Sequence, residues 1–385
     1  MRIGLLTNGV FPYVVGGMQK HTYYLSRYMA RQGVTVDLFY ALYPGAEADK
    51  GLEARLTSEE KANLNLVRVE RPRTTYFPGH YIWNSYKTSQ ALLKAVKRSS
   101  GSLDFLYAQG FAGWSGLAEK KNGATLPPIG VNFHGLEMYQ KCASVSRWAQ
   151  QMMFRPFVRW NLRHADYVLS LGGALDDIVR SSVDPDADII ESPNGIEHEW
   201  LVEKPSESTR GSRTFVFVGR YARRKGIEEL HETLRNFRHS TDWEFEFVGP
   251  IPENRRLEHQ NVRYRGLIKE EEKMRSILRH GDVLVCPSYA EGMPTVILEA
   301  MASGLAIIAS RVGAVDEMVS EENGWTIPPG DPDALRTAME NALSIGEKEL
   351  MGRKKNSLER VEEFLWDTVT ERTVANIQES LNRPE

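Results

Sequence analysis

Residues 214–226 read Thr-Phe-Val-Phe-Val-Gly-Arg-Tyr-Ala-Arg-Arg-Lys-Gly. The first five form an apolar run typical of a buried strand, and a helical pattern covers residues 227–234 after the basic loop. A strand, a glycine turn and a cationic loop ahead of a helix follow the order of a Rossmann-like unit, which predicts an α/β fold. Arg220 can form paired hydrogen bonds with phosphate oxygens and Lys225 can add a point charge, so the loop predicts a diphosphate site. If Arg220 stood alone, an ordinary solvated basic loop would be the better interpretation.

A second stretch, Glu291-Gly-Met-Pro-Thr-Val-Ile-Leu-Glu299, supports that site. Pro294 suits the first turn of a helix, where its missing N–H costs nothing, and residues 295–302 form an apolar helical run. The free N–H groups and partial positive charge of a helix N-terminus favour a diphosphate. We expect Glu291 to reach a sugar on one side of the diphosphate, and Glu299 to accept hydrogen bonds from ribose on the other. Two glutamates at this spacing also occur by chance on solvated helices.

Short apolar runs alternate with helical runs along the whole chain, which predicts two Rossmann-like domains facing across a cleft. Helical runs such as residues 18–31 and 83–97 lie between the runs of the first series, and the polar stretch 203–212 predicts a linker. We place the first domain in residues 1–200 and the second in 201–365. The expected strands are 2–7, 35–41, 64–69, 105–108, 129–133, 167–171 and 189–192, then 215–218, 244–248, 262–265, 283–286, 306–309 and 325–327.

The N-terminal half carries its own polar motifs. Gly16-Gly17 lies between a strand and a helical run, so its backbone can approach a ligand closely. His134 follows an apolar strand at its carboxyl end, where open α/β sheets bind ligands, although a lone histidine there is more often structural. His21, one turn into its helix, is expected to support the site rather than to touch a ligand.

These motifs resemble those of the retaining glycosyltransferases of family 4, which have the GT-B fold. The resemblance covers nearly the whole chain, and in the family the final helix crosses back to the first domain, which residues 366–385 would fit. The resemblance makes residues 1–200 the acceptor-side domain and residues 201–365 the nucleotide-sugar-binding domain. One departure is Met293-Pro294, where many members have Phe-Gly; it removes a backbone donor near the phosphates. The matching segments, in the family's order, are Gly16-Gly17 with His21, Asn132-Phe-His134-Gly135, Ser192-Pro-Asn194-Gly195-Ile196, Gly219-Arg220 with Lys225, and Glu291-Gly-Met-Pro with Glu299-Ala-Met-Ala-Ser-Gly304.

The resemblance implies transfer of a sugar from a nucleoside-diphosphate sugar to a hydroxyl acceptor with retention of anomeric configuration. It implies a front-face reaction, in which the departing diphosphate takes the acceptor's proton, because glutamates at opposite ends of the donor cannot form the close carboxylate pair of retaining glycosidases. The implied catalytic residues are Glu291, His134, Arg220 and Lys225. The implied donor-binding residues are Gly16, Gly17, Arg220, Lys225, Glu291, Gly292, Met293, Thr295, Val296 and Glu299.

Composition agrees with a two-domain cytoplasmic enzyme. The 385 residues are 41% hydrophobic and 26% charged, which is ordinary for a globular protein. Cys142 and Cys286 are the only cysteines, too few for a disulfide framework, and no run is long enough for a signal peptide or a membrane span. The pairs Asp184-Pro-Asp186 and Asp331-Pro-Asp333 look like metal-binding motifs, but Asp-Pro also begins turns and helices, so we expect no metal and no other cofactor.

The net charge of −3 hides an asymmetry. Residues 1–188 hold 22 Lys and Arg against 16 Asp and Glu, a net charge of +6, whereas the remainder carries −9. Within the basic half, residues 146–164 interleave four arginines with Trp and Phe, which favours either contact with anionic lipid headgroups at the inner face of a membrane or an ordinary packed helix. Nothing resembles a nucleic-acid-binding motif, so no nucleic-acid partner is expected.

Two other functions stay open at this point. One is a nucleotide-sugar epimerase of the same fold, which needs no acceptor, and the other is a non-catalytic nucleotide-sugar-binding protein. The intact set of Arg220, Lys225, Glu291 and Glu299 argues against the second. A bacterial cell-surface glycan or a glycolipid is the acceptor that the family resemblance favours, and a lipid-linked acceptor would agree with the basic half.

Overall fold

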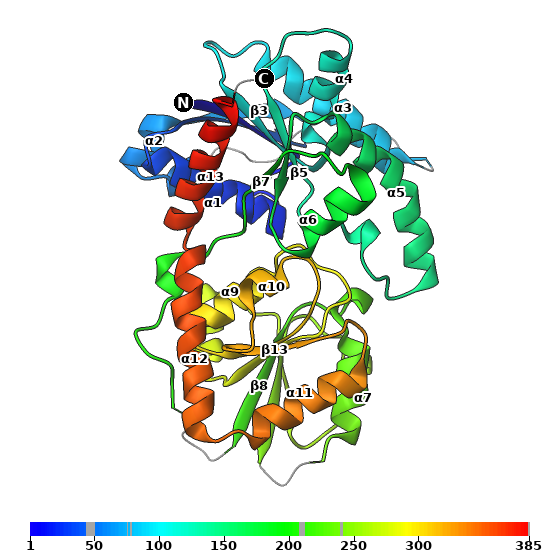
Figure 1. Ribbon diagram of the computed structural model, residues 1–385, viewed down its shortest axis with the longest axis vertical. Helices are drawn as coiled ribbons and strands as arrows, with labels where there is room; N and C mark the ends of the chain where they lie inside the picture. Colours follow the sequence, from blue (N-terminus) through cyan, green and yellow to red (C-terminus); the bar gives the residue numbers. More distant parts are fainter. Residues whose placement is uncertain (44–50, 75, 78, 208–211, 239–241, 384–385) are drawn as a thin grey trace.

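Two parallel sheets, one of seven strands and one of six, form the two halves of the protein. The computed structural model describes residues 1–43, 51–74, 76–77, 79–207, 212–238 and 242–383. Figure 1 shows one half above the other, each with helices packed around its sheet. The predicted fold class, α/β with two Rossmann-like halves facing across a cleft, is confirmed.

Both sheets have the strand order of doubly wound α/β folds. The first is ordered β3-β2-β1-β4-β5-β6-β7 and the second β10-β9-β8-β11-β12-β13. In such sheets ligands bind at the carboxyl ends of the strands where the order reverses, here between β1 and β4 and between β8 and β11. The strands are β1 (Arg2–Thr7), β2 (Thr35–Leu42), β3 (Leu64–Glu70), β4 (Phe105–Gln109), β5 (Ile129–Asn132), β6 (Tyr167–Ser170), β7 (Ile189–Glu191), β8 (Arg213–Val218), β9 (Trp243–Val248), β10 (Val262–Gly266), β11 (Val283–Cys286), β12 (Ala306–Ser310) and β13 (Gly324–Ile327).

Helices follow most strands and cover both faces of each sheet. They are α1 (Gly17–Arg31), α2 (Ser58–Asn63), α3 (His80–Val96), α4 (Trp114–Lys121), α5 (Val145–His164), α6 (Ala174–Ile178), α7 (Ile227–Asn236), α8 (Glu271–Arg279), α9 (Thr295–Ala302), α10 (Val315–Met318), α11 (Pro332–Ser344), α12 (Glu347–Val361) and α13 (Trp366–Leu381). Three single turns matter for the site: η3 (Glu137–Tyr139), η4 (Val179–Val183) and η6 (Arg223–Lys225).

The central strands are largely apolar because both of their faces are buried, whereas the edge strands β3 and β10 carry exposed polar residues such as Arg68 and Arg263. Leu5 and Leu6 are adjacent in β1, yet Leu5 packs into the cluster beneath α1 and Leu6 into the cluster on the opposite face. In the second sheet, Phe215 and Val216 divide between two clusters in the same way. This two-sided burial leaves polar residues for the ends of the strands, where the site forms.

The end of the chain crosses back to the first half. Helix α12 lies along the second half, and α13 continues to pack against α1 and β7, as Figure 1 shows. A single bridge pairs Ile196 with Leu365 at the crossing. The next residue, Trp366, packs against Gly195, where a Cβ would lie 2.5 Å from the indole ring. A glycine is therefore required where the two crossing segments meet.

The predicted strands agree with the observed ones to within two residues at every end. The helical run 295–302 coincides with α9, but the placement of Pro294 inside its first turn is wrong. Pro294 is the N-cap, with an extended ψ of 110°, and its carbonyl accepts a hydrogen bond from the Ile297 N–H. The predicted linker, 203–212, falls partly outside the described residues, and the domain limits at residues 200 and 365 stay predictions.

Candidate functional site

A cleft of about 850 Å³ lies between the two halves. From the first half it is lined by residues that follow β1, end β4 and follow β5, and from the second by residues that end β8 and follow β11. These segments lie at the carboxyl ends of the strands next to the two places where the strand order reverses, between β1 and β4 and between β8 and β11. The lining residues include Gly17, Gln109, His134, Glu137, Met138, Phe154, Val158, Asn194, Arg224, Lys225, Glu291, Gly292, Met293, Thr295 and Val296.

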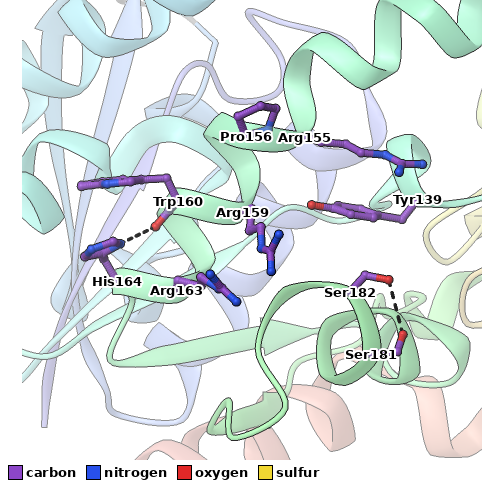
Figure 2. Close-up of a pocket in the computed structure, with 9 residues that line it drawn as sticks. All are labelled: Tyr139, Arg155, Pro156, Arg159, Trp160, Arg163, His164, Ser181 and Ser182. Atoms are coloured by element: carbon purple, nitrogen blue, oxygen red, sulfur yellow. Dashed lines mark hydrogen bonds between the residues drawn. The ribbon is translucent and has the colours of Figure 1, made fainter.

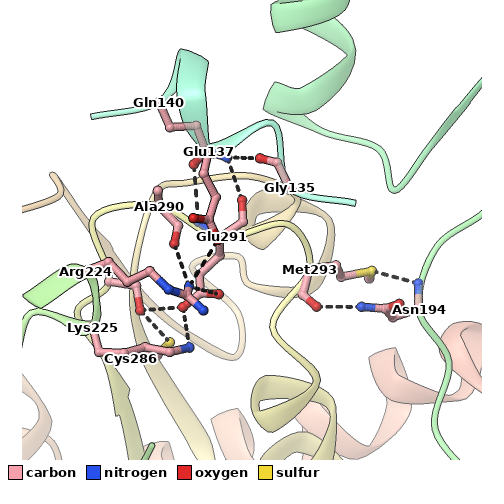
Figure 3. Close-up of polar contacts among 11 residues, drawn as sticks. Gly135, Glu137, Gln140, Asn194, Arg224, Lys225, Cys286, Ala290, Glu291 and Met293 are labelled. Atoms are coloured by element: carbon pink, nitrogen blue, oxygen red, sulfur yellow. Dashed lines mark hydrogen bonds and ion pairs between the residues drawn. The ribbon is translucent and has the colours of Figure 1, made fainter. Parts of the chain in front are cut away.

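Glu291 lies at the centre of the polar contacts in this cleft (Figure 3). Its Oε1 is 2.5 Å from Lys225 Nζ and accepts a hydrogen bond of 2.8 Å from Ser288 Oγ, while its Oε2 is 3.2 Å from Arg224 Nη1. The side chain is only 8% exposed. Burial alone would raise the pKa of Glu291, but the charges of Lys225 and Arg224 outweigh it and hold the pKa below its ordinary value. Glu291 is therefore an anion clamped by two cations.

Gln140 joins the two halves at this point. Its Nε2 donates to the backbone carbonyl of Glu291 at 2.6 Å and to that of Gly135 at 2.5 Å, and its Oε1 accepts from the Glu291 N–H at 3.3 Å. Arg224 also approaches Glu137 in the first half at 3.6 Å. The segment after β5 is thus tied to the loop after β11 by the Gln140 side-chain amide, and to η6 after β8 by the ion pair between Glu137 and Arg224.

His134 occupies a left-handed backbone conformation with φ 56°. Its N–H donates to Asn132 Oδ1 at 2.7 Å, and its Nε2 is hydrogen-bonded to Gln109 Oε1 at 2.6 Å. Burial, together with the nearby ring of His21, lowers the pKa of His134 well below its ordinary value, so the imidazole is neutral near pH 7. A Cβ on Gly292 would lie 2.2 Å from the His134 carbonyl oxygen, so the two halves touch here through a glycine.

His21 belongs to a buried network behind the cleft. Its Nδ1 is 2.8 Å from Asn194 Oδ1, and Asn194 Nδ2 donates to the Met293 carbonyl at 2.6 Å. Because Asn194 presents its oxygen to the ring, Nδ1 carries the hydrogen, and Nε2 is left to accept from the Tyr107 hydroxyl at 3.3 Å. Burial lowers the pKa of His21 to about 4, which keeps the network neutral. The expected supporting place of His21 agrees with this geometry.

The helix N-termini that face the cleft differ in the two halves. The N-terminus of α9 has no side-chain cap, and Thr295 and Val296 line the cleft there. At α1, Gly17 lines the cleft and a Cβ on it would meet nothing within 4 Å, whereas Gly16 is the N-cap and lies outside the lining. Each helix therefore offers unpaired N–H groups to a ligand in the cleft.

The remaining predicted residues lie apart from the central contacts. Glu299, one turn further along α9, is outside the cleft lining, and burial raises the pKa of its carboxyl to about 7. Lys20 lowers that pKa, while Glu197 and Glu271 raise it further. Arg220 is exposed at the end of β8 and forms no hydrogen bond or ion pair with any described residue. The structure brings Lys225 and Glu291 together but leaves Arg220 outside.

Sequence reasoning missed Arg224 and Gln140. Arg224 belongs to the quoted basic loop, and only its place next to Lys225 could have drawn attention to it. The neighbouring Arg223 turns away and pairs with Glu229 at 2.5 Å. Gln140 carries no signal in the sequence, because its partner Glu291 is 151 residues away.

Within the described part of the chain, no group of three or more His, Cys, Asp or Glu side chains could hold a metal ion. The two Asp-Pro-Asp motifs serve local structure: Asp331 caps α11 by accepting from the Ala334 N–H at 2.9 Å, and Asp184 accepts from the Asp186 N–H at 3.2 Å. Among the same described residues, no helix is both long enough and apolar enough to cross a bilayer.

Both halves of the chain match family models of glycosyltransferases. Residues 15–200 match the family model described as Glycosyltransferase Family 4, and residues 212–344 match the model described as Glycosyl transferases group 1. The chain is 27% identical to a putative teichuronic acid biosynthesis glycosyltransferase of Bacillus subtilis, over 71% of this chain and 70% of the relative. It is 25% identical to the MMP alpha-(1->4)-mannosyltransferase of Mycolicibacterium hassiacum, over 100% and 99% of the two chains.

Solved structures agree on the fold. The sucrose-phosphate synthase of Thermosynechococcus elongatus superposes with a TM-score of 0.78 at 21% identity, covering 98% of each chain. Anabaena HepE, solved in complex with UDP and glucose, superposes with a TM-score of 0.67 at 17% identity, covering 98% of this chain and 100% of the other. At these identities the likeness concerns the fold alone.

Proposed function

The chain belongs to glycosyltransferase family 4 and has the GT-B fold, and from this premise we propose that it moves a sugar from a nucleoside-diphosphate sugar to a hydroxyl acceptor with retention of configuration. The observation that carries the proposal is the buried Glu291, held by Lys225 and Arg224 beside the uncapped N-terminus of α9. Cations and free N–H groups at one point of a cleft suit a diphosphate. The relatives' names support glycan synthesis as the setting.

The diphosphate is proposed to bind between η6 and the start of α9. Lys225 and Arg224 carry two positive charges, and Glu291 together with Glu137, 3.6 Å from Arg224, balances them, so the phosphates would meet two cations in a cluster of no net charge. The N–H groups of Thr295 and Val296 add the partial positive charge of the helix terminus. Arg220, which no described residue engages, is available to turn toward the phosphates, where a guanidinium can bind two oxygens at once.

The chemistry proposed for this site needs no protein nucleophile. Both carboxylate oxygens of Glu291 are occupied by cations and Ser288, so Glu291 is assigned to the sugar's hydroxyl groups and to charge balance. The bond from the anomeric carbon to the phosphate oxygen breaks, and the acceptor oxygen bonds to that carbon from the same face. The acceptor's proton passes to the departing phosphate oxygen. Catalysis then rests on positioning and on stabilising the negative charge that develops on the diphosphate.

Neutral His134 is proposed to face the donor sugar from the other wall of the cleft. Because Gln109 fixes one ring nitrogen at 2.6 Å, the ring is held in one orientation. A neutral imidazole next to a sugar that develops positive charge avoids the repulsion that an imidazolium would cause. We assign no metal or other cofactor to the reaction.

A lipid-linked acceptor, reached from a cytoplasmic position at an anionic membrane, is proposed because exposed apolar side chains gather in the first half. Four of them, Val145, Trp148, Met153 and Phe157, lie on α5, close to the arginine-rich part of that helix. Large exposed apolar side chains near basic groups are typical of membrane-surface contacts. The other exposed large apolar side chains of the described residues are Val14, Val15, Tyr43, Tyr76, Phe77, Tyr81, Trp83 and, alone in the second half, Leu267.

The test is a panel of nucleotide-sugars incubated with the protein, with and without candidate acceptors. Transfer or slow donor hydrolysis with one member identifies the donor, and NMR of the product's anomeric proton decides between retention and inversion. A new nucleotide-sugar without transfer would establish an epimerase instead. Donor binding with neither transfer nor hydrolysis would leave a binding protein, and the catalytic proposal would be abandoned.

A further inference from the structure

A second cavity, of about 760 Å³, lies between α5 and η4 (Figure 2). It shares no lining residue with the cleft. Arg155, Arg159 and Arg163 line it from one face of α5, whereas Phe154 and Val158, on another face of the same helix, line the cleft. The spacing of four residues places the three guanidinium groups along one stripe of the helix.

Arg155, Arg159 and Arg163 form no ion pair with an Asp or Glu side chain among the described residues. Arg155 Nε donates to the Met138 carbonyl and Arg163 Nε to the Val183 carbonyl, both at 2.7 Å, and the side chain of Arg159 forms no hydrogen bond with any described residue. Like charges four residues apart on a helix repel one another. An anion in the cavity would remove that repulsion.

Tyr139 adds an independent observation that points to an anion site. Its hydroxyl oxygen is buried and has no hydrogen-bond partner among the described residues, and Figure 2 shows it directed toward Arg159. The Arg155 guanidinium lies over the Tyr139 ring, 4.9 Å from the centroid. Burial raises the pKa of Tyr139, while the three arginines oppose the rise, so the hydroxyl keeps its proton and can donate a hydrogen bond to an anion. A buried hydroxyl without a partner costs free energy unless a ligand or water satisfies it.

Two further hydroxyl groups complete the cavity. Ser181 and Ser182, on η4, line it opposite the arginines, with their oxygens 3.4 Å apart. Guanidinium groups and hydroxyls are the donors that proteins use for phosphate oxygens, and three cations favour a dianion over a monoanion. We propose that this cavity binds a phosphate group, as inorganic phosphate or as the phosphomonoester of a larger molecule, at a site separate from the donor diphosphate.

The position of the cavity relative to the cleft gives such a ligand a role. Glu137 and Met138 of η3 line the cleft, and Tyr139 of the same turn lines the cavity. A phosphate held by the arginines would therefore lie next to η3, the turn that also lines the cleft, in the first half of the protein. This role, anchoring a phosphorylated acceptor, rests on the proposed function, whereas phosphate binding itself does not.

Calorimetric titration with inorganic phosphate tests the site without any need for activity. Loss of two charge-assisted contacts in Arg159→Gln/Arg163→Gln should weaken phosphate binding at least tenfold. Tyr139→Phe keeps the ring and should weaken binding several-fold. Arg180→Gln is the matched control, because Arg180 is exposed on η4 but does not line the cavity. Equal phosphate affinity in the wild type and the double variant would overturn the proposal, including the case in which phosphate binds only in the cleft.

The source of the phosphate is decided with vesicles. Phosphatidic acid carries a phosphomonoester and phosphatidylglycerol a phosphodiester, so vesicles matched in surface charge separate site recognition from general attraction. The ligand is a lipid phosphate if the protein prefers phosphatidic acid vesicles, if inorganic phosphate abolishes this preference by competition, and if the double variant lacks it. If soluble phosphate binds as expected and neither vesicle is preferred, the ligand is a soluble phosphomonoester. Circular dichroism of each variant without phosphate checks that the fold is intact.

Discussion

Glu299 should make nucleotide binding depend on pH near neutrality. Burial, reinforced by Glu197 and Glu271, raises the pKa of its carboxyl from 4.5 to about 7 in the free protein. If the ribose hydroxyls donate hydrogen bonds to Glu299, as the sequence predicts, the ligand favours the carboxylate and lowers this pKa on binding. The nucleotide must then displace a proton whenever the free carboxyl is protonated.

The size of the effect follows from the pKa. With a pKa of about 7, about nine-tenths of Glu299 is protonated at pH 6 and about one-tenth at pH 8. If only the carboxylate binds ribose, affinity should rise about tenfold between these pH values, or about 1.4 kcal/mol. The same raised pKa favours the folded state at low pH. This contribution to the free energy of unfolding is at most about 3 kcal/mol, is fully present below pH 4.5, and is lost as the pH rises through 7.

The assay is calorimetric titration of the wild type and Glu299→Gln with the nucleoside diphosphate that binds best, at pH 6, 7 and 8. The amide keeps a hydrogen-bond acceptor but cannot titrate, and the ligand's own phosphate titration is the same for both proteins. The tenfold rise should therefore appear as a difference between the two proteins. Buffers of different ionisation enthalpy should report nearly one proton more released at pH 6 from the wild type than from Glu299→Gln. Parallel pH profiles would refute the placement of ribose at Glu299.

Further outcomes follow from the same site. Lys225→Ala and Arg220→Ala should each lower turnover by about a hundredfold or more, as for loss of one preorganised donor; full activity in both would remove the phosphate assignment. Glu299→Ala should weaken binding of the free nucleoside diphosphate by about 1–3 kcal/mol, whereas Glu291→Ala should barely change that affinity. A calorimetric titration that gives the reverse order would refute the proposed orientation of the donor. Wild-type protein should co-sediment with anionic vesicles at 0.1 M salt and dissociate near 1 M, as the Debye length falls from about 10 to 3 Å, and Trp148→Glu should bind less; indifference to such vesicles at low salt would favour a soluble acceptor.

The central strands could be predicted from sequence because they are buried on both faces, and the edge strands β3 and β10 because apolar residues recur between exposed polar ones. A run such as Val283–Cys286 has no polar position to confuse its limits, and its observed bounds match the prediction. Pro294 was misplaced because a proline suits both the N-cap and the first helical turn by its fixed φ, here −70°. Only ψ separates the two positions, and ψ depends on how the preceding loop meets the other half of the protein.

The candidate site was predictable only where a local pattern marks it. Lys225 and Glu291 stand next to glycines in the segments that follow β8 and β11, so the local order of strand, glycine and helix predicts that both lie at the carboxyl edge of the second sheet. Gln140 and Arg224 act through contacts between loops that fold separately, and no local pattern records which loops will meet. The exposed position of Arg220 could not be predicted either, because the direction of a side chain after a glycine turn depends on packing beyond the turn.

The charges around Glu291 bear on where the Arg220 side chain lies. Glu291 and Glu137 together balance the charges of Lys225 and Arg224. Because a neutral cluster attracts a further guanidinium only weakly, Arg220 gains more from contact with water, and it is exposed. A diphosphate bound as proposed would add negative charge that this cluster cannot balance, and Arg220, two residues after β8, would be the cation nearest in the chain that has no anionic partner among the described residues. The exposed position of Arg220 therefore agrees with the proposed phosphate contact.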